Sequence, residues 1–176
     1  MSLVGTPSDP QPLRADADVA RFRRAMARFA TGVTVVTARV AGVDHAMTAS
    51  AFTSVSLEPL LVLVCVEREA RFHDAVTESG YWGVSLLDES ARTISQWLST
   101  RGRPLHGQLD RVPHRRGPVT GVALVDPALA AIECRTTDLH PAGDHSIVVG
   151  EVMSIDLPDS PDGPLLYHRG AYTHLR

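Results

Sequence analysis

Strand-length segments joined by short turns fill most of this sequence of 176 residues, and they constrain its fold more than any other feature. Each segment is rich in β-branched or other apolar residues, and the turns between them contain Gly, Pro or Asp. We expect seven or eight strands, at residues 33–40, 45–47, 52–57, 60–66, 81–87, 128–139, 146–155 and 165–172. Because short turns join neighbouring strands antiparallel, the pattern predicts a mainly β fold, a closed or nearly closed barrel covered by a few helices.

Three segments show helical periodicity instead. The first begins at Asp16 or Asp18, stops at Gly32 and carries an apolar face made of Val19, Phe22, Met26 and Phe29. The other two helices are expected over residues 70–78 and 88–98. Since so few helices alternate with strands, a doubly wound parallel sheet is disfavoured.

The N-terminal residues and the charge balance limit the partners of the chain. Residues 1–17 are rich in Pro and polar residues without periodicity, so we expect a disordered tail followed by one domain over 18–176. The net charge is −3, and the basic residues are interleaved with acidic ones, which argues against nucleic-acid binding. No apolar run approaches the ~20 residues that span a bilayer, and the N-terminus lacks a signal-peptide pattern. We therefore expect a cytoplasmic protein that does not contact a membrane.

Several kinds of site are excluded by residue type or spacing. All 17 basic residues are Arg, so lysine chemistry is impossible, and every cationic contact to a ligand must come from Arg, His or backbone N–H groups. The common nucleotide, hydrolase and zinc-protease signatures do not occur, and the eight His residues lack metal-ligand spacing, so we predict no metal site. Cys65 and Cys134 lie in apolar, strand-like runs, where a small buried side chain is expected.

Four segments carry residues that suit a ligand, although each also has an ordinary structural explanation. Residues 47–56 hold five hydroxyl side chains, which can bind phosphate or ring oxygens, but composition alone favours a Ser/Thr-rich edge strand. Residues 68–74 begin a helix and contain two Arg. This pattern is equally typical of a phosphate site and of a helix with charge pairs on its solvent-exposed face. Residues 143–145, Gly-Asp-His, can orient a charged ligand or simply form a turn. Apart from these segments, the long stretch 99–121 has no periodicity and is expected to be functional or mobile.

The last strand supplies the fourth segment. If residues 165–172 form one strand, Tyr167, Arg169 and Ala171 share a face, with Tyr172 on the other. An aromatic ring and an Arg on one face can flank a planar, anionic ligand, whereas two packed tyrosines are the structural alternative.

Taken in order, five segments resemble the short-chain flavin reductase family, the reductase components of two-component flavin-dependent monooxygenases. They are residues 22–37, 47–57, 61–66, 143–152 and 164–172. The resemblance covers roughly residues 20 to 174 and implies an FMN-binding split barrel with antiparallel, Greek-key-like strands. It also implies a homodimer with its flavin sites near the subunit interface.

The same resemblance implies a set of site residues. Flavin contacts are expected along the ring and ribityl chain, at the phosphate, at the end of the central strand and from the last strand: Thr48, Ala49, Ser50 and Ala51; Ser54, Arg71, Phe72 and His73; Cys65 and Val66; Tyr167 and Arg169. His145 is expected in the nicotinamide pocket as the catalytic or positioning residue. Residues 101–120 depart from the family because they lack its aromatic loop residue.

The function implied is an NAD(P)H:flavin oxidoreductase. Hydride would pass from NADH or NADPH to N5 of FMN or FAD, and the reduced flavin would leave for a separate oxygenase. The alternatives are a flavin-binding split barrel without reductase activity, serving in binding or storage, and a β-barrel binding module that takes no flavin.

Overall fold

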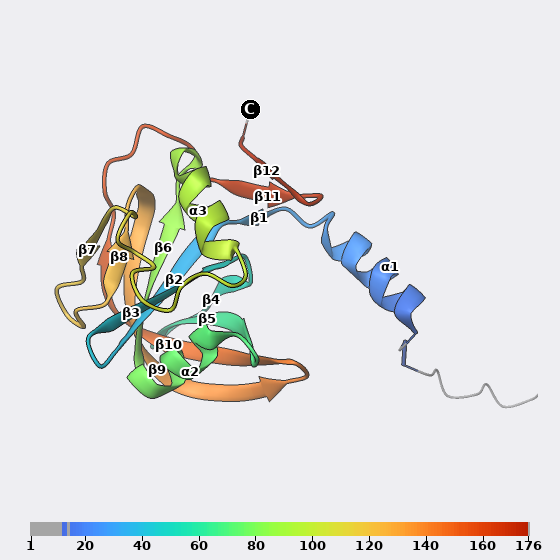
Figure 1. Cartoon of the computed structure of the whole chain (residues 1–176), viewed down its shortest axis with the longest axis horizontal. Coiled ribbons are helices and arrows are strands. Elements are labelled where there is room, and N and C mark those ends of the chain that lie inside the picture. The colour runs from blue at the N-terminus through green and yellow to red at the C-terminus, as the bar shows by residue number, and fades with distance from the viewer. Residues whose placement is uncertain (1–11, 14, 176) are drawn as a thin grey trace, which may run out of the picture.

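The computed structural model describes residues 12–13 and 15–175, and these form a mainly β body from which one helix projects (Figure 1). That helix, α1 (Asp16–Met26), begins inside the predicted tail of residues 1–17, most of which lies outside the described residues. It also ends six residues before the predicted stop at Gly32, because Thr31 and Gly32 form the short strand β1 (Thr31–Gly32).

A seven-stranded antiparallel sheet makes up the body, in the order β3-β2-β6-β9-β10-β5-β4. The strands are β2 (Thr34–Val40), β3 (Val43–Ala49), β4 (Phe52–Leu57), β5 (Leu60–Glu67), β6 (Tyr81–Leu87), β9 (Ala128–Ala142) and β10 (His145–Asp156). Within the described residues, two small sheets accompany it: β1 with β11 (Leu166–His168) and β12 (Ala171–Thr173), and β7 (His114–Arg116) with β8 (Ala123–Val125). The predicted mainly β, antiparallel fold is confirmed.

The connection between β3 and β4 forces this sheet to curl. These strands lie at opposite ends of the hydrogen-bonded order, yet only Ser50 and Ala51 separate them in sequence. Two residues can bridge only a short distance, so the two edges of the sheet must come together at this point. The result is a barrel that is split between β3 and β4, beside the hydroxyl-rich segment.

Both faces of β2 are buried, which explains its nearly continuous β-branched sequence. Val36 packs inside the barrel with Trp82, Val64 and the side chains of α2 (Arg71–Ser79). Val35 packs on the other side with residues of the 3-10 turn η1 (Glu89–Ala91), of α3 (Arg92–Ser99) and of β8. Both valines are completely buried, and the two cores together hold the helices against the sheet.

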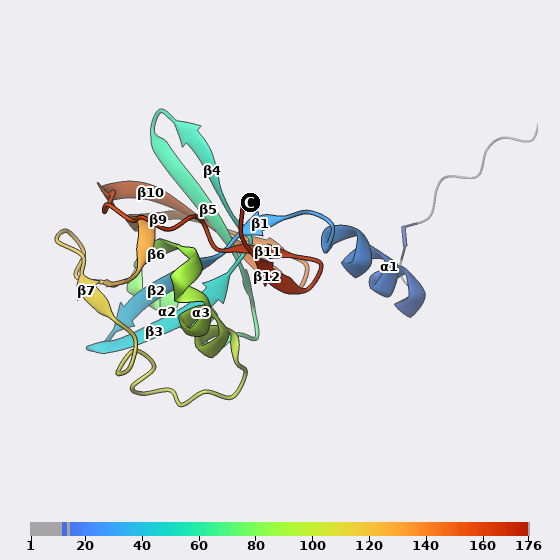
Figure 2. The ribbon, with the colours of Figure 1, turned by 90° about the horizontal axis from the view of Figure 1, so that it is seen from above.

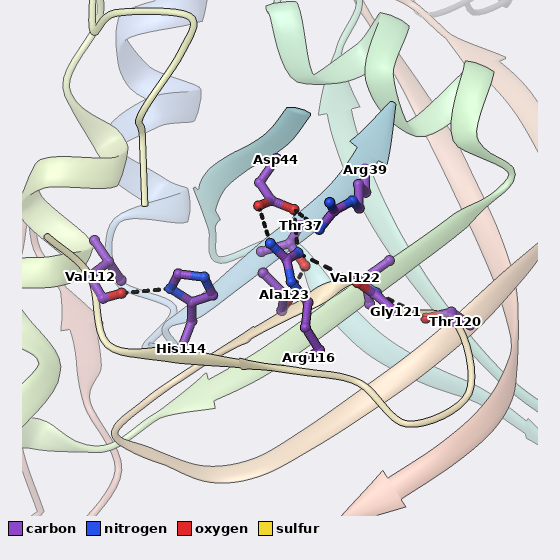
Figure 3. A network of polar contacts seen from close by, with 10 residues as sticks. All are labelled: Thr37, Arg39, Asp44, Val112, His114, Arg116, Thr120, Gly121, Val122 and Ala123. Carbon is purple, nitrogen blue, oxygen red and sulfur yellow. Dashed lines mark hydrogen bonds and ion pairs between the residues drawn. The ribbon is translucent and has the colours of Figure 1, made fainter. Parts of the chain in front are cut away.

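The second half of the segment 99–121 is fixed to the sheet by charged groups. The Arg116 guanidinium binds the Asp44 carboxylate in a bidentate ion pair, with both N–O distances 2.6 Å, and Arg39 lies 3.7 Å from the same carboxylate (Figure 3). Burial tends to raise the pKa of Asp44, but the hydrogen bond and charge of Arg116 outweigh it and lower that pKa. Thr37 also donates to the Ala123 carbonyl across β2 and β8.

Glu133 fixes the turn that follows. Its buried carboxylate accepts hydrogen bonds from the backbone N–H groups of Val119 and Thr120 and from the Thr120 hydroxyl. Ser99 belongs to α3, and the rest of the expected long loop has two parts: residues 100–113, which carry no helix or strand, and residues 114–121, which are fixed to the barrel.

The last predicted strand is wrong in detail. Residues 165–172 do not continue as one strand but form the hairpin β11–β12, which turns at Arg169 and Gly170. Both turn residues have positive φ, of 51° and 79°. As a result Tyr167 faces Tyr172 across the hairpin, and Arg169 does not share a strand face with Tyr167.

Helix α1 stands away from the barrel, as both views show (Figures 1 and 2). None of its described residues is buried. Its apolar face and the segment after it are exposed, with Phe22 64% and Phe29 67% accessible. The predicted apolar face exists, but it does not pack on its own barrel.

Candidate functional site

Two pockets meet at Thr48, near the end of β3 where the barrel splits. We call the first the arginine pocket; it is walled by β3, the start of α2 and the segment after α3, with His45, Thr48, Arg71, Phe72, Arg101 and Arg103 among its lining residues. We call the second the tyrosine pocket; its lining includes Thr48, Ser50, Arg92, Gln96, Tyr167 and Tyr172. Thr48 and Ser99 line both pockets, so one elongated ligand can reach from one to the other.

The tyrosine pocket has an aromatic wall that is held in place by polar contacts. The rings of Tyr167 and Tyr172 meet edge to face with centroids 5.3 Å apart. The Tyr172 hydroxyl shares a 2.9 Å hydrogen bond with the Ser95 hydroxyl, and the Arg92 guanidinium lies 5.6 Å from the centre of the Tyr172 ring. Such a wall suits a flat, conjugated ligand, and the nearby Thr48 and Ser50 supply hydroxyl groups.

Thr48 is itself fixed by the helix behind it. Its hydroxyl donates a 2.8 Å hydrogen bond to the carbonyl of Ser95 in α3. α3 therefore positions two walls of the tyrosine pocket, because the same Ser95 holds Tyr172 through its side chain.

The arginine pocket is rich in positive charge. Arg71 Nη2 donates to the Arg103 carbonyl at 2.6 Å, and Arg103 Nη2 donates to the Ala46 carbonyl at 3.0 Å. Arg101 forms a 3.3 Å ion pair with Glu67. Burial, with a further contribution from the neighbouring charge of Arg71, lowers the pKa of Arg103.

His45 lines the same pocket. Burial lowers the pKa of His45; the charge of Asp44 opposes this effect and that of Arg71 adds to it. The imidazole Nδ1 is buried without a hydrogen-bond partner among the described residues, as is Arg103 Nε. Buried polar atoms are nearly always paired, so these two nitrogens are unusual, and both belong to residues that line the arginine pocket.

A third group of polar residues lies beyond the arginine pocket, where β5 meets β10. His145 is at the start of β10 with its Nδ1 2.8 Å from Asp144 Oδ1, and this hydrogen bond lowers the pKa of Asp144. His73 Nε2 lies 2.9 Å from the Ser146 hydroxyl. Glu67 lines both this area and the arginine pocket, which places the two next to each other.

The structure brings five of the predicted site residues to the two pockets: Thr48, Ser50, Arg71, Phe72 and Tyr167. The hydroxyl-rich segment, for which composition alone favoured an edge strand, does contain an edge strand, β4. It also supplies two of these pocket residues.

The other predicted site residues lie elsewhere. Ala49 is buried, Ala51 accepts a backbone hydrogen bond from Cys65, and Ser54 is an exposed residue of β4. His145 is half-buried at the start of β10, in the β9–β10 hairpin.

Three more predicted flavin contacts lie outside the two pockets, and they stay predictions. The Val66 side chain is completely buried in the barrel core, so it does not line a pocket. His73 points to Ser146 and lines the third area instead of the arginine pocket. Arg169 lies at the tip of the β11–β12 turn, where its backbone N–H donates to the Ala27 carbonyl.

Sequence reasoning missed His45, Arg103 and Tyr172 as pocket residues. Tyr172 was placed on the wrong face because the turn at residues 169–170 went unrecognised, although Gly170 was a usable signal for it. Arg103 gave no signal, because it lies in a segment without periodicity whose path depends on its contacts with β3 and α2.

Comparison with known proteins gives a consistent result. The model of the family described as "Flavin reductase like domain" matches residues 26–176. The chain is 40% identical to the reductase component of 4-hydroxyphenylacetate 3-monooxygenase from Thermus thermophilus, over 88% of this chain and 95% of that protein. It is 36% identical to an NADH-dependent FMN reductase from Streptomyces nodosus subsp. asukaensis, over 88% of this chain and 84% of that protein.

The fold has a close match among solved structures. The NADH:FAD oxidoreductase SgcE6 of Streptomyces globisporus superposes with a TM-score of 0.85 at 33% identity, covering 95% of this chain and 99% of the other.

Proposed function

The chain belongs to the family of flavin reductase like domains, and from that membership we propose that it is a flavin reductase that oxidises NADH and reduces FMN or FAD. The observation that carries the proposal is the pair of joined pockets at the split of the barrel, one with an aromatic wall and one lined by arginines. A flavin has the same two parts, a flat ring system and a phosphorylated chain.

The residues present fit a flavin. The ring would lie in the tyrosine pocket against Tyr167 and Tyr172, with Thr48 and Ser50 close to its polar edge. The ribityl chain would pass Thr48 toward Arg71 and Phe72, which would continue to the phosphate as the resemblance implies. Ala49, Ala51, Ser54 and Cys65 remain proposed contacts of the same ligand.

Hydride transfer from the nicotinamide to N5 is the chemistry that the flavin supplies when bound. The protein then needs only to hold two rings together, so its residues act by position and charge. The α3 residues Ser95 and Arg92 hold Tyr172 in place, and Tyr172 with Tyr167 would cover one side of the bound ring. His145, hydrogen-bonded to Asp144, would orient the nicotinamide nucleotide beside the arginine pocket.

We further propose two protein partners. Reduced flavin would pass to a separate oxygenase, as the name of the Thermus relative implies for that protein. A second copy of the chain would cover the exposed apolar face of α1, giving a homodimer. A cytoplasmic location remains a prediction; no helix in the described part of the chain is long and apolar enough to cross a bilayer.

The test is the oxidation of NADH, followed by its absorbance, with FMN or FAD as acceptor. We expect flavin-dependent oxidation; binding of flavin without oxidation would favour a binding or storage role instead. A protein that gains no thermal stability with FMN would favour a barrel that takes no flavin.

His145→Ala gives a finer test of the site. We expect it to raise KM for NADH several-fold while leaving the Kd for FMN within about twofold, since His145 lies outside both flavin pockets. Equal losses in both constants would contradict the proposed position of His145.

A further inference from the structure

The arginine pocket contains positive charge that its ion pairs do not neutralise. Arg71, Arg101 and Arg103 line it together with Glu67 and Glu69. Arg101 pairs with Glu67, whereas within the described residues neither Arg71 nor Arg103 lies within ion-pair distance of a carboxylate. Two guanidinium groups that face the same space without a carboxylate partner attract an anion.

Arg103 is held in a fixed position by the backbone around it. Its Nη2 donates to the Ala46 carbonyl in β3, and its Nη1 donates to the Thr100 carbonyl. Arg71 in turn donates to the backbone carbonyl of Arg103. The segment 100–113 thus runs past β3 and brings Arg103 to the start of α2 (Figure 2). A guanidinium fixed in this way loses little conformational freedom when it binds a ligand.

Two residues that line the pocket also have a buried hydrogen-bonding atom without a partner. Four buried side-chain nitrogen or oxygen atoms of the described residues have no partner, and two of them, Arg103 Nε and His45 Nδ1, belong to residues that line this pocket. Arg103 Nε is always an N–H donor, so a ligand with several acceptor oxygens would give it a partner once the side chain turns toward the ligand.

We propose that Arg103 anchors a phosphate ester in the arginine pocket and so makes the protein select phosphorylated ligands. This inference rests on the proposed function, and it names a residue on the segment that departs from the family pattern. Arg is suited to the role because its planar fork binds phosphate oxygens in pairs, and this chain has no Lys to replace it. Because Thr48 joins the two pockets, the phosphate of FMN or FAD is the nearest source, and the pyrophosphate of NADH is the second.

The experiment compares ligands with and without phosphate. FMN and riboflavin are titrated by flavin fluorescence against the wild type, Arg103→Gln and Arg103→Lys. The matched control is Arg111→Gln, which makes the same charge change at an exposed position of the same segment, outside both pockets. Thermal unfolding of each variant shows whether it remains folded.

We expect Arg103→Gln to raise the Kd for FMN about tenfold or more and the Kd for riboflavin less than about twofold. Arg103→Lys should give an intermediate change for FMN, because it keeps the charge and loses the fork. The control should bind both ligands as the wild type does. If Arg103→Gln weakens the binding of FMN and riboflavin equally, or of neither, Arg103 does not anchor the flavin phosphate. The inference is then overturned unless the NADH comparison described next supports it.

A second comparison tests the other source of phosphate. KM is measured for NADH and for dihydronicotinamide riboside, which lacks phosphate, with riboflavin as the acceptor. If Arg103→Gln raises KM for NADH but not for dihydronicotinamide riboside, Arg103 anchors the phosphate of the nicotinamide nucleotide.

Inorganic pyrophosphate, measured by calorimetry, tests the anchor without any flavin. If the wild type binds pyrophosphate through Arg103 but neither binds flavin nor oxidises NADH, the inference stands and the proposed function fails. If the wild type binds neither pyrophosphate nor a phosphorylated ligand, the inference fails as well.

Discussion

Replacing Glu133 with Gln should destabilise the fold measurably, because this buried carboxylate holds the turn that follows β7. Oε1 accepts hydrogen bonds from the Thr120 N–H at 2.7 Å and from the Thr120 hydroxyl at 2.6 Å, and both oxygens lie 3.2 Å from the Val119 nitrogen. An amide has nearly the same shape, so the change removes charge and one acceptor without leaving a cavity.

The magnitude follows from these three donors. A hydrogen bond to a charged group contributes ~1.5–3 kcal/mol and a neutral one ~0.5–1.5 kcal/mol, so each donor loses about 1 kcal/mol. The free energy of unfolding should therefore fall by about 3 kcal/mol, which lowers Tm by about 6–12 °C for a domain of this size. Glu151→Gln, which breaks a surface ion pair with Arg135, is the control and should cost less than about 1 kcal/mol.

The loss of unfolding free energy in Glu133→Gln should also depend on pH. Burial raises the pKa of Glu133, but the hydrogen bonds from Thr120 and Val119 outweigh it, so the pKa in the folded protein lies below its usual range. A carboxyl with a depressed folded pKa stabilises the protein above its unfolded pKa of ~4.3, and this stabilisation disappears as pH falls through the folded pKa.

Urea unfolding at pH 7 and at pH 4 and below is the assay. The difference between the wild type and Glu133→Gln should be largest at pH 7 and should shrink on acidification. A loss at pH 7 no larger than that of Glu151→Gln would refute the reasoning, as would a difference that grows as the pH falls.

Two further predictions concern the core. Gly150→Ala should lower the free energy of unfolding by ~1–3 kcal/mol, since a Cβ there would lie 2.6 Å from the buried ring of Trp82. The control is Gly163→Ala, where a Cβ would have open space around it. Urea unfolding followed by tryptophan fluorescence measures both variants. Cys134 should not react with a thiol reagent at pH 8 in the folded protein, because burial and the charge of Glu133 raise its pKa to about 12. Comparison with Cys134→Ser identifies the contribution of this thiol to the labelling. Rapid labelling of Cys134 without unfolding would contradict its buried position.

The sequence allowed prediction of those features that depend on local periodicity. Strands such as β5 and β6 were placed correctly within a residue, because each is an apolar run ended by a clear turn residue. The helix that carries Phe72 was also found, along with the buried character of Cys134. These features are set by neighbouring residues, which a sequence shows directly.

The features that failed depend on contacts between distant segments. Thr31 and Gly32 pair with β11, which is distant in the sequence, so no local pattern could indicate this strand. Likewise, Arg103 is held in the arginine pocket by hydrogen bonds to Ala46 and from Arg71, which lie 57 and 32 residues away in the sequence. The resemblance to a family supplied Tyr167 and Arg71, but it could not supply a residue on the segment that departs from that family.

The two-residue link between β3 and β4 sets an upper limit on the width of the ligand site at this end of the barrel. Three successive Cα–Cα steps join Ala49 to Phe52, and they span at most about 11 Å when fully extended. The width of the opening at that end is therefore limited by bond lengths, whatever the surrounding side chains do. Substitutions on the walls can change which ligand is held there, but only an insertion or deletion in this link can change the maximum distance between the two edges.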